Sequence, residues 1–210
     1  MMGVEPPRCP NGGPFDMRMS LAFGAWLDHE PMWLPPRDAD AVLAALRDEL
    51  PWEQREIVLF GRRILQPRLI AWAGDVGYRY SGQTLEPRPF TPAARGLLAR
   101  ACERTGVPFN HILANRYRSG DDRMGLHADD EPELGEDPVV AIVSLGTSRR
   151  LVVRPRRKGV RQRHDLDLGH GSLLIMGGTC QRHYVHGVPR QPGLQSERIS
   201  LTFRRLLRPP

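Results

Sequence analysis

The sequence is short of lysine and cysteine and contains no long apolar run. Lys158 is its single lysine, so arginine carries nearly all of the positive charge. The three cysteines are odd in number and form no Cys-x-x-Cys pair, which argues against a disulfide framework and a cysteine-based zinc site. No run of about 18 apolar residues and no signal-peptide pattern occurs. The low cysteine content and the lack of apolar runs predict a protein of a reducing cytoplasm. High arginine content is typical of genomes rich in G and C, so we expect the source to be bacterial.

The residues that are present suffice for one folded unit with a basic surface. The chain has 210 residues, and 40% of them are hydrophobic. Its formal net charge is +6 and its sequence pI is about 9.9, a balance that favours a polyanionic partner. Residues 1–20 are rich in Pro and Gly without periodicity and are predicted to be a disordered arm. We therefore expect a monomer with one domain over residues 21–210.

Periodicity along the chain predicts two helices and many short strands. Apolar residues recur at helical spacing over residues 38–50, and Thr91-Pro92 begins a second helix that Gly106 ends. This order predicts an α+β protein, with helices and a β-hairpin over residues 21–108 and a jelly roll (a double-stranded β-helix) over residues 109–210. The predicted strands are 57–60, 64–65, 69–72, 78–80, 112–117, 139–145, 151–153, 165–168, 173–176 and 198–204.

The last predicted strand has an unusual polar face. From Arg198 to Arg204 the residues alternate, so Ile199, Leu201 and Phe203 share one face, while two arginines and two hydroxyl residues share the other. A strand that faces a core rarely carries two guanidinium groups unless something anionic lies opposite them. The strand therefore predicts an anion-binding pocket.

A metal site is predicted upstream of this strand. His127 and Asp129 lie two residues apart, so on an extended segment both side chains point the same way. Two histidines and one carboxylate form the facial triad of non-haem Fe(II) oxygenases, although a zinc hydrolase can use the same ligands. His186, before Gly-Val-Pro at a predicted strand end, is suited to face inward. The candidates for the second histidine are His164, His170, His183 and His186.

The two arginines of the strand are predicted to have different tasks. A diacid that chelates the metal needs a cation at its far end, and Arg198 can supply a bidentate clamp. Arg204 lies roughly 20 Å away along a straight strand, so we expect it near the metal or the Asp129 carboxylate. Asn115 and Tyr117 alternate on another predicted strand and offer further hydrogen-bond donors.

These residues resemble the AlkB family of Fe(II)/2-oxoglutarate dioxygenases, which reverse alkylation damage in nucleic acids. The similarity runs from about Phe60 to Leu207 and implies Fe(II), 2-oxoglutarate and O₂ as cofactors. The segments that carry it are Asn115-Arg116-Tyr117, His127-Ala128-Asp129-Asp130-Glu131, Val143-Ser144-Leu145-Gly146, His170-Gly171-Ser172-Leu173-Leu174, His183-Tyr184-Val185-His186 and Arg198 to Arg204.

The resemblance implies a role for each of the site residues. It implies that His127, Asp129 and His186 are the catalytic iron ligands. Arg198 would hold the distal carboxylate of 2-oxoglutarate, and Arg204 would lie at the iron end. The implied contacts of 2-oxoglutarate are Asn115, Tyr117, Arg198, Thr202 and Arg204.

Further segments resemble a subfamily of nuclear DNA-repair AlkB homologues, in which a β-hairpin lid recognises the nucleotide. Those segments are Leu59-Phe60-Gly61-Arg62, Pro67-Arg68, Gly74-Asp75 and Tyr78-Arg79-Tyr80-Ser81-Gly82. In that subfamily an apolar wedge fills the gap left by a flipped base, and Phe60 would take this part, the alternative being an ordinary core aromatic. The residues implied to bind the substrate are Phe60, Gly61, Arg62, Tyr78, Tyr80, Ser81, Asp130 and Glu131.

The activity implied is oxidative demethylation of N-alkylated bases such as 1-methyladenine and 3-methylcytosine, in DNA with RNA as a second polymer. Tyr80 and His127 would sandwich the base, whose positive charge Asp130 and Glu131 would favour. Arginines among residues 149–163 would contact phosphates, the alternative being a solvated loop. Two other functions stay open: an oxygenase acting on a protein or small metabolite, and a non-catalytic nucleic-acid-binding jelly roll. No membrane partner is expected.

Overall fold

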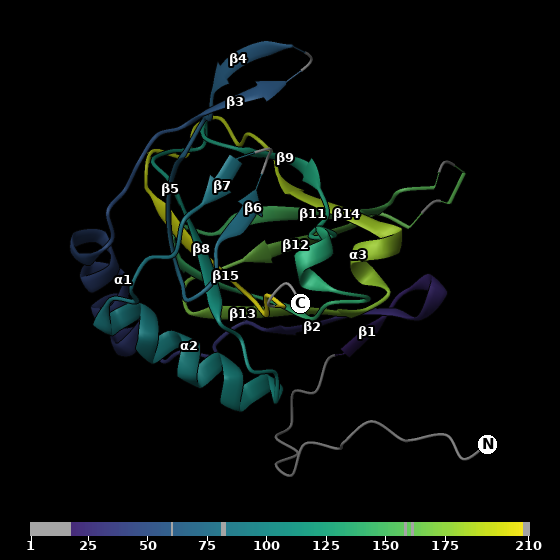
Figure 1. Ribbon diagram of the computed structural model, residues 1–210, viewed down its shortest axis with the longest axis horizontal. Helices are drawn as coiled ribbons and strands as arrows, with labels where there is room; N and C mark the ends of the chain where they lie inside the picture. Colours follow the sequence, from purple (N-terminus) through teal and green to yellow (C-terminus); the bar gives the residue numbers. More distant parts are fainter. Residues whose placement is uncertain (1–17, 60, 81–82, 158, 161, 208–210) are drawn as a thin grey trace.

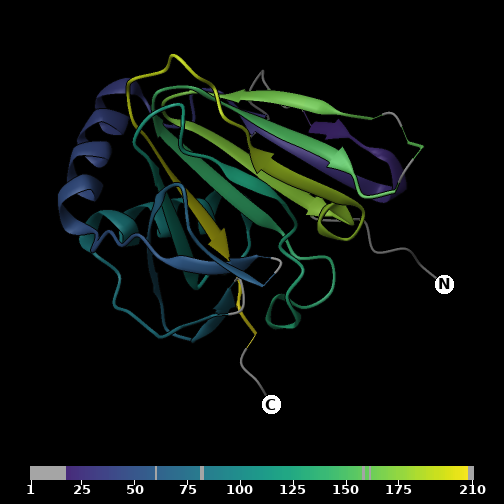
Figure 2. The same ribbon diagram turned by 90° about the horizontal axis from the view of Figure 1, so that it is seen from above.

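The computed structural model describes residues 18–59, 61–80, 83–157, 159–160 and 162–207. Two antiparallel sheets face each other in this part of the chain (Figure 1 and Figure 2). The larger sheet has the strand order β1 (Arg18–Ser20), β2 (Ala25–Glu30), β13 (Ser172–Gly178), β10 (Val140–Gly146), β15 (Arg198–Arg204), β8 (His111–Tyr117) and β5 (Leu69–Gly74). The smaller sheet has the order β12 (His164–Leu168), β11 (Arg149–Pro155), β14 (Tyr184–Val188) and β9 (Met124–His127).

Two helices cover the outer face of the seven-stranded sheet, and both were predicted. Helix α1 (Pro36–Glu49) has proline in its first turn. Helix α2 (Pro92–Thr105) begins where the Thr91 side chain accepts a hydrogen bond from the Ala94 N–H, and it ends at Gly106. Gly106 has a φ of 70°, a left-handed conformation that glycine adopts without steric cost. In the described residues, no helix is long and apolar enough to cross a membrane.

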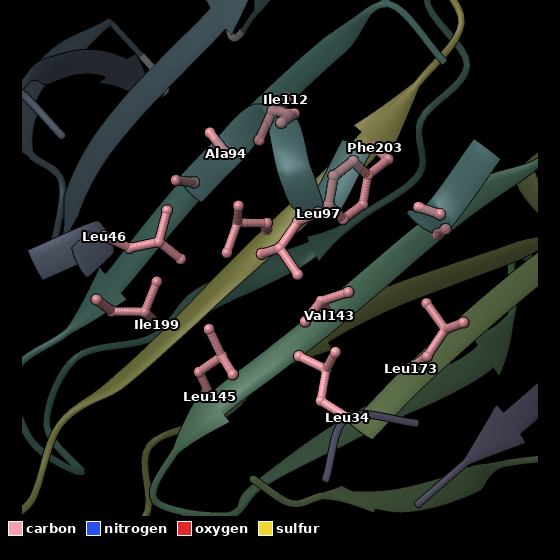
Figure 3. Close-up of a cluster of buried hydrophobic side chains, with 14 of the residues drawn as sticks. Leu34, Leu46, Ala94, Leu97, Ile112, Val143, Leu145, Leu173, Ile199 and Phe203 are labelled. Atoms are coloured by element: carbon pink, nitrogen blue, oxygen red, sulfur yellow. The ribbon is translucent and has the colours of Figure 1, made fainter. Parts of the chain in front are cut away.

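The largest apolar core lies between these helices and the sheet. Leu46 of α1 and Leu97 of α2 point toward Val143, Ile199 and Phe203 of the sheet (Figure 3). Burial of each of these large side chains contributes roughly 1.5–3 kcal/mol relative to exposure. The apolar residues of β15 therefore all face the helices.

A second apolar core joins the two sheets. Ile142 and Met176 of the large sheet pack in the same cluster as Leu151 and Val153 of the small sheet. Because residues alternate along β15, its polar residues face this space between the sheets. The alternation that the sequence predicts thus directs two arginines toward the small sheet.

Two hairpins lie outside the two large sheets. One joins β3 (Glu56–Leu59) to β4 (Arg62–Leu65) and projects from the body of the protein (Figure 1). Its turn is at Gly61, as predicted, where φ is 75°. The other joins β6 (Tyr78–Tyr80) to β7 (Gln83–Leu85). Phe60 and Ser81 lie outside the described residues, as does the side chain of Tyr80.

The N-terminal part of the chain contributes more to the sheet than its sequence indicates. Strand β1 pairs with β2 at residues 18–20, within the segment that was predicted to be a disordered arm. Strands β2 and β5 precede residue 109, yet both belong to the large sheet, so a boundary there does not separate the sheet from the rest. The pattern of β2 was hidden because it carries Asp28, a buried carboxylate that Arg104 neutralises.

Candidate active site

Three side chains converge between the sheets at one end of β9. His127 ends β9 and pairs in register with His186 of β14, and Asp129 follows two residues after His127. The Nε2 atoms of both histidines lie 4.0 Å from the Asp129 carboxylate oxygens. The candidate ligand atoms all lie within 4.8 Å of one another, and this is the only such cluster in the described part of the chain. Of the four candidate histidines, His186 is therefore the one that completes the site.

Second contacts orient two of these three residues, His127 and Asp129. His127 Nδ1 lies 3.0 Å from the carbonyl oxygen of Gly125, which leaves Nε2 directed at the cluster. Gln181, in the short helix α3 (Cys180–His183), accepts a hydrogen bond from the Asp129 backbone N–H at 3.0 Å. Arg204 Nη2 donates to Asp129 Oδ1 at 2.7 Å, and both side chains are buried. These contacts therefore fix the orientation of His127 and Asp129.

The electrostatics of the cluster suit a divalent cation. Burial lowers the pKa of His127 and lowers that of His186 to about 3, so both imidazoles are neutral near pH 7. Burial opposes ionisation of Asp129, but Arg204 and the two histidines outweigh it and lower the pKa to about 2. Asp129 Oδ2 is buried and has no hydrogen-bond partner in the described residues. Neutral imidazoles and an unsatisfied carboxylate oxygen are what Fe(II) requires, so the residues fit the metal.

A cavity beside the cluster is lined by the residues predicted for the co-substrate. The large sheet supplies the polar donors, and Met124, Ile142, Leu151 and Val188 form apolar walls. The predicted residues that line it are Asn115, Tyr117, Arg198 and Thr202, together with His127 and His186.

Arg198 is the charged group of this cavity that lacks a counterion. It is 1% exposed, and its Nη2 donates to Ser144 Oγ at 2.7 Å. Its Nε and Nη1 find no hydrogen-bond partner among the described residues, and its Cζ lies 5.2 Å from the Tyr117 ring centroid. A buried guanidinium with two unsatisfied nitrogens is costly unless an anion binds it. The residues therefore also fit the distal carboxylate of 2-oxoglutarate.

Several residues of the site were not singled out by their sequence. Arg68 is buried, and its Nε donates to Asn115 Oδ1 at 2.7 Å, which fixes the orientation of that amide. His111, also buried, lies opposite Arg204 in the sheet register and contacts Tyr78 edge-on at 4.9 Å. Arg68 and Ser144 belong to segments that carry the family resemblance, whereas Gln181 and His111 belong to none of them.

The predicted substrate residues occupy separate places. Tyr78 is wholly buried beside Arg204 and interacts with Glu131, whose pKa is raised by burial. Asp130 points to the outside, where Arg156 Nη2 donates to its Oδ2 at 2.6 Å. Arg62 is exposed on the projecting hairpin. Glu131 thus interacts with the interior side chains Tyr78 and Arg204, whereas Asp130 pairs with a surface arginine.

The arginines of residues 149–163 also divide into two groups. A groove beside β9 and β14 is lined by Arg154, Arg156, Arg157 and Arg163. Arg149, which was predicted to be a surface residue, is 1% exposed. Its guanidinium donates to the backbone carbonyl oxygens of Ser119, Asp122 and Pro189 at 2.8–2.9 Å. Arg149 therefore holds two loops together, and only its neighbours are available to an external anion.

Comparison with known proteins agrees with this geometry. The family described as the 2OG-Fe(II) oxygenase superfamily matches residues 27–204. The human alpha-ketoglutarate-dependent dioxygenase alkB homolog 3 is 38% identical over an alignment 208 residues long, which covers 95% of this chain and 73% of that protein. The mouse DNA oxidative demethylase ALKBH2 is 36% identical over a gapped alignment 222 residues long, which covers 98% of this chain and 92% of the relative.

A solved structure confirms the predicted fold. The structure of OsALKBH1 superposes with a TM-score of 0.61 at 17% identity, covering 90% of this chain and 99% of that one. The predicted jelly-roll core is thereby confirmed. The family match, the identities and the His-Asp-His cluster show that the chain belongs to the AlkB family of 2OG-Fe(II) oxygenases, a dioxygenase that uses Fe(II), 2-oxoglutarate and O₂.

Proposed function

We propose that this dioxygenase demethylates N-alkylated bases such as 1-methyladenine and 3-methylcytosine in DNA, with RNA as a second polymer. The observation that carries the proposal is the position of Glu131. Its Oε2 is buried without a hydrogen-bond partner in the described residues, and its side chain interacts with Tyr78, Asp129 and Arg204. A buried acceptor at this place suits the exocyclic amine or the positive charge of an alkylated base. The ALKBH2 relatives to which this chain is similar are named DNA oxidative demethylases.

The roles of the protein side chains follow from their charges and contacts. His127, Asp129 and His186 would hold the metal, and Arg198 would hold the distal carboxylate of 2-oxoglutarate. With these cofactors bound, the site supplies oxidation of an N-methyl group, which then leaves the base as formaldehyde. Arg204 keeps Asp129 ionised, so the carboxylate stays a ligand rather than taking up a proton.

The nucleic acid would meet the protein on two surfaces near the metal. Arg62 on the exposed β3–β4 hairpin approaches from one side, with Gly61 at the turn and Phe60 as the proposed wedge. Tyr80 and His127 would stack on the flipped base, and Tyr78 and Ser81 would support it. The arginine groove would contact phosphates. We further propose that the protein acts as a monomer with one catalytic domain, and a bacterial cytoplasm stays its predicted location.

One assay tests this function directly. The protein with Fe(II) and 2-oxoglutarate is incubated with single- and double-stranded oligonucleotides that carry 1-methyladenine or 3-methylcytosine, and formaldehyde and succinate are measured. We expect formaldehyde from the alkylated strands and none after His127→Ala. Phe60→Ala should slow reaction on duplex more than on single strands. Succinate without formaldehyde from any oligonucleotide would instead favour an oxygenase of a protein or small metabolite.

A further inference from the structure

Arg156 contacts both segments that carry the metal ligands. It follows β11, and its backbone N–H donates to the carbonyl oxygen of His183 at 2.8 Å. Its Nη2 donates to the Gln181 carbonyl oxygen at 2.9 Å, and its Nε lies 3.5 Å from the Tyr184 carbonyl oxygen. Arg156 therefore satisfies three carbonyl groups at the end of α3, just before His186.

The same guanidinium also reaches the loop of the first two ligands. Its Nη2 donates to Asp130 Oδ2 at 2.6 Å, and Asp130 directly follows the ligand Asp129. The side chain of Gln181, whose carbonyl group Arg156 binds, accepts the hydrogen bond of the Asp129 N–H. One cation thus links the Asp129–Asp130 loop to the segment that leads to His186.

Arg156 is at the same time part of the wall of the arginine groove. The groove is also lined by Arg154, Arg157 and Arg163, and its side-chain charges are cationic. The Arg156 and Asp130 side chains are 38% and 52% exposed, so their ion pair meets solvent and can exchange partners. A phosphodiester group is a strong acceptor for a guanidinium fork, and it would compete with the carboxylate.

We propose that Arg156 couples the arginine groove to the metal-binding loop. A nucleic-acid phosphate in the groove takes the guanidinium from Asp130, so Asp130 is released only when a strand is bound. Asp130 then opposes strand binding through Arg156, because it occupies the guanidinium in the absence of nucleic acid. The coupling rests on the proposed function, because that function supplies the ligand of the groove, a nucleic-acid strand. It adds a positioning role for Arg156 that depends on strand binding.

A double-mutant cycle tests the coupling. The protein is loaded with Mn²⁺ and 2-oxoglutarate, and its affinity for an unmodified single-stranded oligonucleotide is measured by fluorescence anisotropy. The strand has no alkylated base, so base recognition by Asp130 does not enter. We expect Asp130→Asn to tighten binding about two- to fivefold, the range of an exposed ion pair. In an Arg156→Gln background the same substitution should tighten binding clearly less, because only its general charge effect remains. Arg156→Lys should restore part of the Asp130 effect, because it keeps the charge.

Asp165 supplies the matched control. It accepts hydrogen bonds from Arg163, another arginine of the groove, at 2.7 and 3.0 Å. Asp165→Asn removes the same charge from the same surface, and it should tighten binding by the same factor with or without Arg156. Thermal unfolding of each variant checks that it is folded.

The possible outcomes separate the coupling from the proposed function. The coupling is overturned if Asp130→Asn tightens binding equally in both backgrounds, as a general charge effect would. It is also overturned if the strand does not bind at all, even when alkylated strands release formaldehyde. If the cycle behaves as expected but no alkylated strand releases formaldehyde, the coupling stands and the proposed demethylation fails.

Discussion

The two sheets contribute opposite chemistry to one site. The four-stranded sheet brings His127 and His186, both neutral, and the Asp129 loop. The seven-stranded sheet brings the cations Arg198 and Arg204, which lie at the two ends of β15 on the same face. The small sheet presents metal ligands, and the large sheet presents cations that need an anion. The metal and 2-oxoglutarate therefore belong between the two sheets.

The two arginines of β15 differ in the charge of their hydrogen-bond partners. Arg204 is paired with a carboxylate of the protein, whereas Arg198 donates to the neutral hydroxyl of Ser144 and lies against the Tyr117 ring. The protein therefore supplies the counterion at the metal end and leaves the other end for a ligand. Substitutions in the small sheet and in the large sheet should therefore affect different properties of the protein.

The largest effect is expected on the side of the small sheet. Asp129→Ala removes a metal ligand and deprives the buried Arg204 of the carboxylate to which it donates. Metal binding should be lost, formaldehyde release should fall to background, and unfolding in urea should show a loss of about 3–5 kcal/mol. The double variant Asp129→Ala/Arg204→Met should recover the stability but not the metal, measured by Mn²⁺ titration. Equal stability of the single and double variants would contradict the pairing.

A smaller effect is expected on the side of the large sheet. Arg198→Gln removes the positive charge that would bind the distal carboxylate of 2-oxoglutarate. A charge-assisted hydrogen bond of this kind contributes about 1.5–3 kcal/mol. The KM for 2-oxoglutarate should rise roughly 30- to 100-fold. Metal affinity, measured on the same samples, should stay unchanged because Arg198 does not contact the triad. A parallel loss of metal affinity would show that the two ends are not separate.

His111, in the large sheet, is expected to make the stability of the protein depend on pH. Burial and Arg204 lower its pKa to about 3, against about 6.5 in the unfolded chain. Between these values the unfolded chain binds the proton and the folded chain does not, so stability falls as the pH falls through this window. The difference is about 2 kcal/mol at pH 5. His111→Phe keeps the ring against Tyr78 and should remove this part of the acid sensitivity. Urea unfolding of both proteins at pH 5 and 7.5 measures it, and equal pH slopes would exclude His111 as the cause.

The smallest effect is expected on the outer face of the small sheet. Arg154→Gln and Arg157→Gln should each weaken oligonucleotide binding about two- to fivefold and reduce the salt slope by about 1. Arg149→Gln provides the contrast, because its guanidinium is buried among backbone carbonyls. It should lower stability and leave the salt slope unchanged. A changed slope for Arg149→Gln would mean that this arginine reaches the strand after all.

Local patterns predicted the elements whose signals are contained in a few neighbouring residues. The helix ends at Thr91 and Gly106, the turn at Gly61 and the two faces of β15 all depend on such short-range chemistry. The choice among the downstream histidines could not be made locally, because it depends on β9 pairing with β14, some 60 residues later. The interior place of Arg149 was missed for the same reason, since the carbonyl groups that bind it come from two distant loops.

Polar residues inside strands were the other source of error. Strand β2 carries Asp28 and His29, which conceal its alternation, and its register with β13 is long-range. Gln181 and Arg156 act through contacts that only the folded chain creates. The separation of Asp130 from Glu131 likewise depends on where Arg156 lies, which adjacent letters of the sequence cannot show.

The ion pair between Arg204 and Asp129 has a consequence for how the two layers are held in register. Arg204 comes from a strand of the seven-stranded sheet, and Asp129 from the loop that follows a strand of the four-stranded sheet. Sliding one sheet over the other would therefore move a metal ligand, so the packing of the two layers sets the geometry of the triad.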